Sequence, residues 1–195
     1  MKNAIIIIIG LLMSLHLNAQ KYFTRTGTTQ FEASEKAFEP VEATNKSTTA
    51  IFNTKTGAVA TQVFMAGFQF KNALMQEHFN ENYMDSHQYP KAVFKGEVKD
   101  FSMERLTTDS SFYLDGILTI RGIEKRIQTK VFIKEGNNHL IVTANFSVHP
   151  EDFDIKIPSL VREKIAKEVQ IKIKYEFIEN KLIINLDFFI IIQGL

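Results

Sequence analysis

The sequence contains no cysteine, no tryptophan and only four prolines among its 195 residues. Without cysteine there is no disulfide, no thiol nucleophile and no attachment atom for a lipoprotein anchor, so core burial and sheet hydrogen bonds must supply the stability. The 17 phenylalanines provide large apolar rings without a polar group, which suits a dry interior. A net charge of +1 favours neither nucleic acid nor an anionic membrane surface as a partner.

The N-terminus has the pattern of a secretory signal peptide. Lys2 precedes an apolar run from Ala4 to Leu17, which ends at Leu17-Asn18-Ala19. We therefore expect residues 1–19 to be removed near Ala19 and the protein to be periplasmic or secreted. A retained N-terminal anchor is the alternative, but the run is short for a membrane span, so we expect no stable membrane insertion.

The C-terminal residues 181–195 form a second apolar block, broken only by Asn185 and Asp187. The block is too short for a membrane span and carries an acid near its middle. An extra strand is one interpretation, and an extension of unknown role is our default. Residues 20–180 then form one domain, because neither an internal repeat nor a low-complexity linker divides them.

Strict alternation of apolar and polar residues runs through most of the second half of the chain. Such a period of two places one apolar and one polar face on each strand of an antiparallel sheet. We predict strands at Lys21–Ser34, Ser47–Asn53, Ala58–Met65, Ala92–Phe101, Phe112–Arg121, Lys125–Glu135, Leu140–His149 and Val169–Phe177. Two short helices are predicted, at Asn72–Asn80 and, with Ser159 as its cap, at Leu160–Lys167. Gly136-Asn137-Asn138 predicts a hairpin turn.

So many half-buried strands bury their shared apolar face by closing into a barrel or by packing as a sandwich. The function then depends on whether the interior is filled or hollow. Glycine or alanine at Gly96, Gly116 and Ala144, on the apolar face, would leave space there.

Catalytic and metal-binding patterns are weak. His78, Asp85 and His87 have ligand chemistry, but their spacing matches no metal signature. No Gly-x-Ser-x-Gly elbow is present, and the acids near Asp152 are typical of a solvated turn. We therefore expect neither a metal site nor a catalytic residue, and we expect no enzyme.

Three groups of residues together resemble the YceI-like family of secreted bacterial proteins. They are Leu74-Met75-Gln76-Glu77-His78-Phe79 followed by Tyr89-Pro90-Lys91-Ala92-Val93-Phe94, then Gly116-Ile117-Leu118-Thr119-Ile120-Arg121-Gly122-Ile123-Glu124-Lys125, then Asp152-Phe153-Asp154-Ile155. The resemblance covers roughly residues 30–177 and departs from many relatives at Arg121 and Asp154. It implies a single antiparallel, eight-stranded, lipocalin-like β-barrel that holds a polyisoprenoid or quinone-type lipid. The Gly-x-Trp signature of true lipocalins is absent.

From the alternation and the resemblance we predict a set of lipid-lining residues. They are Phe64, Phe68, Met75, Phe79, Phe94, Val98, Leu114, Leu118, Val131, Val142, Phe146, Ile171 and Ile173. Met75 and Phe79 belong to a helix that either closes one mouth of the barrel or simply covers it. The predicted function is a carrier that holds a long-chain isoprenoid, with no cofactor. A hydrolase or isomerase acting in the same cavity, a filled barrel used for protein association, and a homodimer are the open alternatives.

Overall fold

The computed structural model describes residues 21–35, 39–106 and 110–179, and these form one antiparallel sheet with short helical turns. The strands are β1 Lys21–Ser34, β2 Glu42–Asn53, β3 Ala58–Phe64, β4 Gln69–Phe70, β5 Lys91–Val98, β6 Ser110–Ile120, β7 Ile123–Gly136, β8 His139–Val148 and β9 Ile165–Glu179. The helical segments are α2 Ala73–His78, the π-turn η3 Phe79–Tyr83, and the 3-10 turns η2 Met65–Gly67, η4 Met103–Arg105, η5 Pro150–Phe153 and η6 Ser159–Val161. No helix within the described ranges has the length and apolar character needed to cross a membrane.

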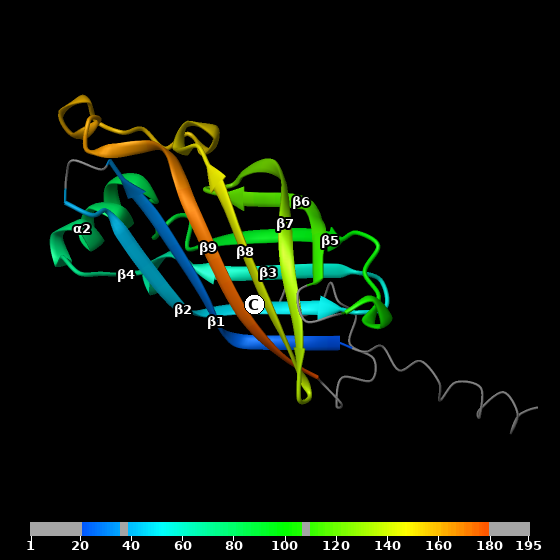
Figure 1. Ribbon diagram of the computed structural model, residues 1–195. Helices are drawn as coiled ribbons and strands as arrows, with labels where there is room; N and C mark the ends of the chain where they lie inside the picture. The colour runs from blue at the N-terminus through cyan, green and yellow to red at the C-terminus, as the bar shows by residue number, and fades with distance from the viewer. Residues whose placement is uncertain (1–20, 36–38, 107–109, 180–195) are drawn as a thin grey trace, which may run out of the picture.

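The sheet closes on itself. Its nine strands follow the order β1-β9-β8-β7-β6-β5-β3-β2-β4, and β1 also pairs with β2. Because β3 and β4 pair with different parts of β2, they share one position, and nine strands make an eight-stranded barrel. The strands wrap around a common interior in Figure 1. The predicted fold class is confirmed.

A buried asparagine holds the break between β3 and β4. Asn45 is fully buried on β2. Its Nδ2 donates a hydrogen bond to the carbonyl of Phe64 at 2.9 Å, and its Oδ1 accepts from the backbone N–H of Ser47 at 2.8 Å. A Cβ on Gly67 would lie 2.6 Å from Asn45 Nδ2, so glycine is required there.

β1 bends at Gly27, as its glycine suggested. The register of β1 against β2 shifts on both sides of Gly27, which is the mark of β-bulges. A Cβ on this glycine would lie 2.6 Å from Cδ1 of Tyr175 on β9. The bend therefore makes room for the Tyr175 ring inside the barrel.

The hairpin predicted at residues 136–138 joins β7 and β8. Gly136 pairs with His139 across a two-residue turn, and Asn138 has a positive φ of 60°.

The helix predicted at Asn72–Asn80 is α2, which is capped by Asn72. The Oδ1 of Asn72 accepts hydrogen bonds from the N–H groups of Leu74 and Met75 at 2.9 and 3.3 Å.

The second predicted helix, Leu160–Lys167, is wrong. Only the turn η6 occupies its start, β9 begins at Ile165, and Ser159 makes no side-chain cap. Pairing of β9 with both β8 and β1 satisfies the backbone groups that a short isolated helix leaves exposed, so the sheet overrides the local pattern.

The core has two parts, one at each end of the barrel. The floor cluster, at the end with the β2–β3 turn and η4, contains Tyr22, Ala50, Phe52, Val59, Val98, Phe112, Leu114, Val131, Ile133, Leu140, Val142, Ala144, Tyr175 and Phe177, with Phe101 packed against it. The mouth cluster, at the end with α2, contains Phe31, Ala33, Ala43, Met65, Phe68, Met84 and Ala92, with Phe79 packed against it.

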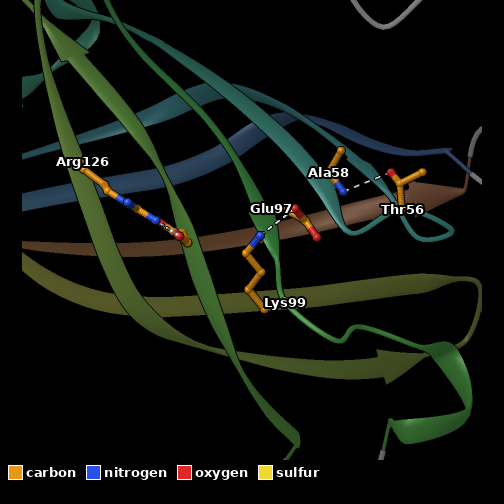
Figure 2. Close-up of polar contacts among 6 residues, drawn as sticks. Thr56, Ala58, Glu97, Lys99 and Arg126 are labelled. Atoms are coloured by element: carbon orange, nitrogen blue, oxygen red, sulfur yellow. Dashed lines mark hydrogen bonds and ion pairs between the residues drawn. The ribbon is translucent and has the colours of Figure 1, made fainter.

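On the outer surface, a bidentate ion pair links neighbouring strands. Arg126 Nε and Nη2 on β7 donate to the Asp115 carboxylate on β6 at 2.9 and 2.6 Å. This hydrogen bonding lowers the pKa of Asp115 to about 2. Figure 2 shows Arg126 together with the Lys99–Glu97 pair, whose Nζ to Oε2 distance is 2.8 Å.

Replacing Gly116 with alanine should destabilise the barrel. Gly96 and Gly116 face each other, but the ring of Phe94 covers both, with its Cζ 2.7 and 2.6 Å from their virtual Cβ atoms. These glycines therefore seat a ring and leave no free space. We expect Gly116→Ala to lower the free energy of unfolding by about 1–3 kcal/mol, as overpacking does. Chemical denaturation measures this, and Ser111→Ala, exposed on the same strand, is the control, expected to stay within about 0.5 kcal/mol.

The ion pair of Asp115 with Arg126 should stabilise the fold at neutral pH and lose this stabilising effect in acid. Because its pKa falls from 3.8 to about 2 on folding, the stabilisation is complete above the unfolded value and disappears as the pH drops through the folded one. We expect Asp115→Asn to melt below the wild type at pH 7, and the difference to vanish as pH approaches about 2. Thermal melts across pH test this. A pH-independent difference, or the same acid trend in Glu124→Gln, would refute it.

A candidate lipid-binding cavity

The barrel encloses a cavity of about 640 Å³. Its wall consists mainly of apolar side chains that point inward from all eight barrel positions, and it extends from the floor cluster to α2 and η5. The volume lies within the range typical of small-molecule sites, about 300–1,000 Å³. The interior is hollow rather than filled.

Twelve of the thirteen predicted lining residues lie on the cavity wall. They are Phe68, Met75, Phe79, Phe94, Val98, Leu114, Leu118, Val131, Val142, Phe146, Ile171 and Ile173. Their contact with a lipid stays a prediction.

Phe64 does not lie on the cavity wall. It is 45% exposed, and the Lys91 ammonium sits 5.8 Å from the centre of its ring. On β3 the wall residues are Val59, Thr61 and Val63. The alternation of the strand therefore turns Phe64 outward.

Four phenylalanines close part of the mouth. The ring of Phe79 stacks on Phe31 at 5.3 Å and contacts Phe68 and Phe70 at 5.7 and 5.1 Å between centroids. Leu74 on α2 lines the cavity although it is 56% exposed. This helix thus covers the mouth and meets both the cavity and solvent.

Sequence reasoning missed several wall residues at the mouth. Phe153 in η5 is 1% exposed and lines the cavity with Ile155. Their motif carried the family resemblance but was interpreted as a solvated turn. Asp154 takes a left-handed φ of 52°, which aims Phe153 inward while its own carboxylate stays outside.

A group of hydroxyls interrupts the apolar wall. This hydroxyl cluster consists of Thr29 on β1, Thr48 on β2, Thr61 on β3 and Tyr175 on β9. Thr29 Oγ1 lies 2.8 Å from Thr48 Oγ1 and 2.9 Å from the Tyr175 hydroxyl. Burial raises the pKa of Tyr175 to about 12, although hydrogen bonds from Thr29, Thr48 and Thr61 oppose the rise. Tyr175 therefore remains a neutral hydroxyl.

The acidic and basic side chains on the described part of the cavity wall lie at the mouth. They are Glu39 between β1 and β2, His78 at the end of α2 and Lys164 just before β9. Within the described ranges, no three histidine or acidic side chains come together as a metal site would need. His78, Asp85 and His87 are thus not assembled into such a group.

The fold and the cavity define a closed antiparallel barrel with an apolar lumen, and an eight-stranded barrel of this kind has room for one small ligand. The profile of the YceI-like domain matches residues 20–177. The chain belongs to the YceI-like family.

The predicted signal peptide, residues 1–19, and the extension 181–195 lie outside the described residues.

Solved structures share this fold at low sequence identity. A polyisoprenoid binding domain from Saccharophagus degradans, implicated in plant cell wall breakdown, superposes with a TM-score of 0.71 at 11% identity, covering 84% of this chain and 100% of that one. BcnA from Burkholderia cenocepacia has a TM-score of 0.63 at 17% identity, covering 77% and 95%. The Campylobacter jejuni YceI protein has a TM-score of 0.60 at 16% identity, covering 74% and 88%. No curated protein matches the chain in sequence.

Removing the Phe79 ring should lower the stability of the fold, because the ring packs against three other phenylalanines at the mouth of the barrel. We expect Phe79→Ala to lower the free energy of unfolding by about 2–3 kcal/mol, below the usual 3–5 for a fully buried ring, because Phe79 is half-buried. Leu74→Ala, on the same helix but mostly exposed, should change it by less than about 0.5 kcal/mol. Urea denaturation measures both. Equal changes in the free energy of unfolding for the two variants would show that the four packed phenylalanines at the mouth do not stabilise α2.

Proposed function

We propose that this protein binds a long-chain isoprenoid or a similar amphiphilic lipid in its lumen and acts as a periplasmic carrier. The observation that carries the proposal is the apolar cavity of about 640 Å³ enclosed by the barrel. A lipid tail that enters this cavity removes its apolar surface from water, which is the main favourable contribution to such binding. Membership of the YceI-like family and the likeness to a polyisoprenoid binding domain support this ligand class.

Tail burial is sufficient to drive binding. A prenyl chain that buries about 500 Å² gains roughly 12 kcal/mol at about 25 cal/mol per Å². Lost translational freedom and chain ordering offset a large part of this gain. The remainder still supports tight binding, with selectivity for the length and shape of the tail.

The placement of charge favours binding over catalysis. Glu39, His78 and Lys164 lie at the mouth, whereas the inner wall holds apolar residues and neutral hydroxyls. General acid–base chemistry needs an ionisable group within hydrogen-bond reach of the reacting atom. The described inner wall offers such a reaction no carboxylate or imidazole.

Extraction of the purified protein tests the ligand class directly. Organic solvent should release a prenyl lipid in near-stoichiometric amount, identified by mass spectrometry. Material that carries no lipid and does not take up a prenol added to it would contradict the proposal.

A cavity-filling variant should abolish binding without unfolding the barrel. Leu118 lies on the cavity wall of β6, and its neighbour Thr119 does not. We expect Leu118→Trp to reduce the lipid recovered at least tenfold, because the larger ring occupies the lumen. Thr119→Trp, on the opposite face of the same strand, should retain the wild-type amount. Circular dichroism verifies that both variants fold, and equal lipid content in the two would place the ligand elsewhere.

A further inference from the structure

The hydroxyl cluster is built into the inner half of the cavity. Thr29 and Tyr175 are 7% and 4% exposed, and Thr48 is fully buried. Thr29, Thr61 and Tyr175 line the cavity, whereas Thr48 supports them from behind. The cluster joins four adjacent strands, β3, β2, β1 and β9, next to the floor cluster, which includes Tyr175.

The backbone is shaped to hold Tyr175 in this place. Gly27 lies against its ring, and the two register shifts of β1 flank that glycine. The ring also meets Phe177 edge-on at 6.2 Å between centroids. Packing thus holds the ring in one position, with its hydroxyl 2.9 Å from Thr29 Oγ1.

The hydrogen-bonding capacity of the cluster is not exhausted by its internal bonds. Each hydroxyl has one proton to donate and two lone pairs to accept with. Four hydroxyls therefore present more acceptor sites than their own four protons can fill. A hydrocarbon tail lying over Thr29, Thr61 and Tyr175 makes no use of this capacity, whereas a ligand hydroxyl gains a hydrogen bond there.

The chemistry of the site is that of a neutral oxygen. The acidic and basic groups of the described cavity wall, Glu39, His78 and Lys164, lie at the other end. A phosphate placed at the cluster would lose its hydration without meeting a cation. A ligand hydroxyl would donate its proton to one of the free lone pairs there at little cost.

We infer that the lumen recognises an uncharged, oxygen-bearing head group at its inner end, through Thr29, Thr61 and Tyr175, with the tail directed toward α2. The inference rests on the proposed function, since it supposes that the lumen holds a prenyl lipid. It narrows the ligand to prenols and prenyl phenols, which have a proton to donate, and it excludes prenyl phosphates from this binding mode.

Three probes with one carbon skeleton test the inference: phytol, its hydrocarbon phytane, and phytyl monophosphate. Each displaces a fluorescent fatty probe from the delipidated protein. We expect phytol to bind about three- to tenfold more tightly than phytane, the gain of one net hydrogen bond. The phosphate should bind more weakly than phytol. Phytane binding as tightly as phytol, or phosphate binding more tightly, would overturn the inference.

Two variants assign the effect to the cluster. Tyr175→Phe and Thr29→Val should each bring the phytol-to-phytane affinity ratio toward one while phytane affinity stays near the wild-type value. Tyr22→Phe is the matched control, because Tyr22 belongs to the same floor cluster but does not line the cavity, and its ratio should not change. The two variants are tested separately, so a folding defect in one leaves the other as the test, and an unchanged ratio in a folded variant refutes the assignment.

The outcomes separate the two proposals. Binding of phytol and phytane with equal affinity would overturn the head-group inference and leave lipid binding intact. Failure of all three probes, with no lipid in the extract, would overturn both. A crystal structure of the phytol complex with its oxygen at α2 would also overturn the head-group inference and leave lipid binding intact.

Discussion

Closure of the sheet through β1 is the constraint on which the lumen depends. β1 pairs with β9 on one side and β2 on the other, so the backbone ladder fixes the radius of the barrel before any side chain packs. In an open sheet, the inner side chains would collapse onto one another. In a closed barrel of eight strands, they meet only if they are long enough, and otherwise a void remains. Strand pairing therefore sets the radius of the barrel, and side-chain packing determines how much of the interior stays open.

Packing fills the two ends differently. At the floor, Phe52, Phe101 and Phe112 interlock with ring centroids 4.9 and 5.2 Å apart, so this end is closed by rigid side chains. At the mouth, the cover consists of α2 and η5, which are short segments laid over the barrel end. Leu74 there contacts both solvent and cavity. The floor therefore supplies the cohesion that a chain without disulfides needs, while the mouth is covered only by short segments.

The local pattern of the sequence was sufficient to place most wall residues. Inward and outward positions alternate along a strand whatever its neighbours are, so Leu114, Leu118 and Phe146 could be assigned without knowing the register. Phe64 was predicted to point inward, but Val63 and Met65 on either side of it line the cavity, so the alternation turns Phe64 outward. The helix predicted at Leu160–Lys167 is wrong because β9 pairs with β1 and β8, and this pairing makes the second half of the segment a strand. Arg121 and Asp154 both lie in turns between paired segments, so departures at these positions leave the strand pairing unchanged.

The hydroxyl cluster could not be predicted from the sequence, because Thr29 and Tyr175 lie 146 positions apart and only the register brings them together. Along each strand a threonine on the inner face looks like a polar interruption of the pattern. Buried polar groups in this barrel otherwise do structural work, as Asn45 does when it holds the end of β3. Thr29 and Tyr175 complete no turn, cap no helix and face the cavity, so apolar residues of similar size would pack at least as well there. A polar group that breaks the apolar pattern without completing a turn or a cap is the kind of local inconsistency expected at a functional site, which agrees with the head-group inference.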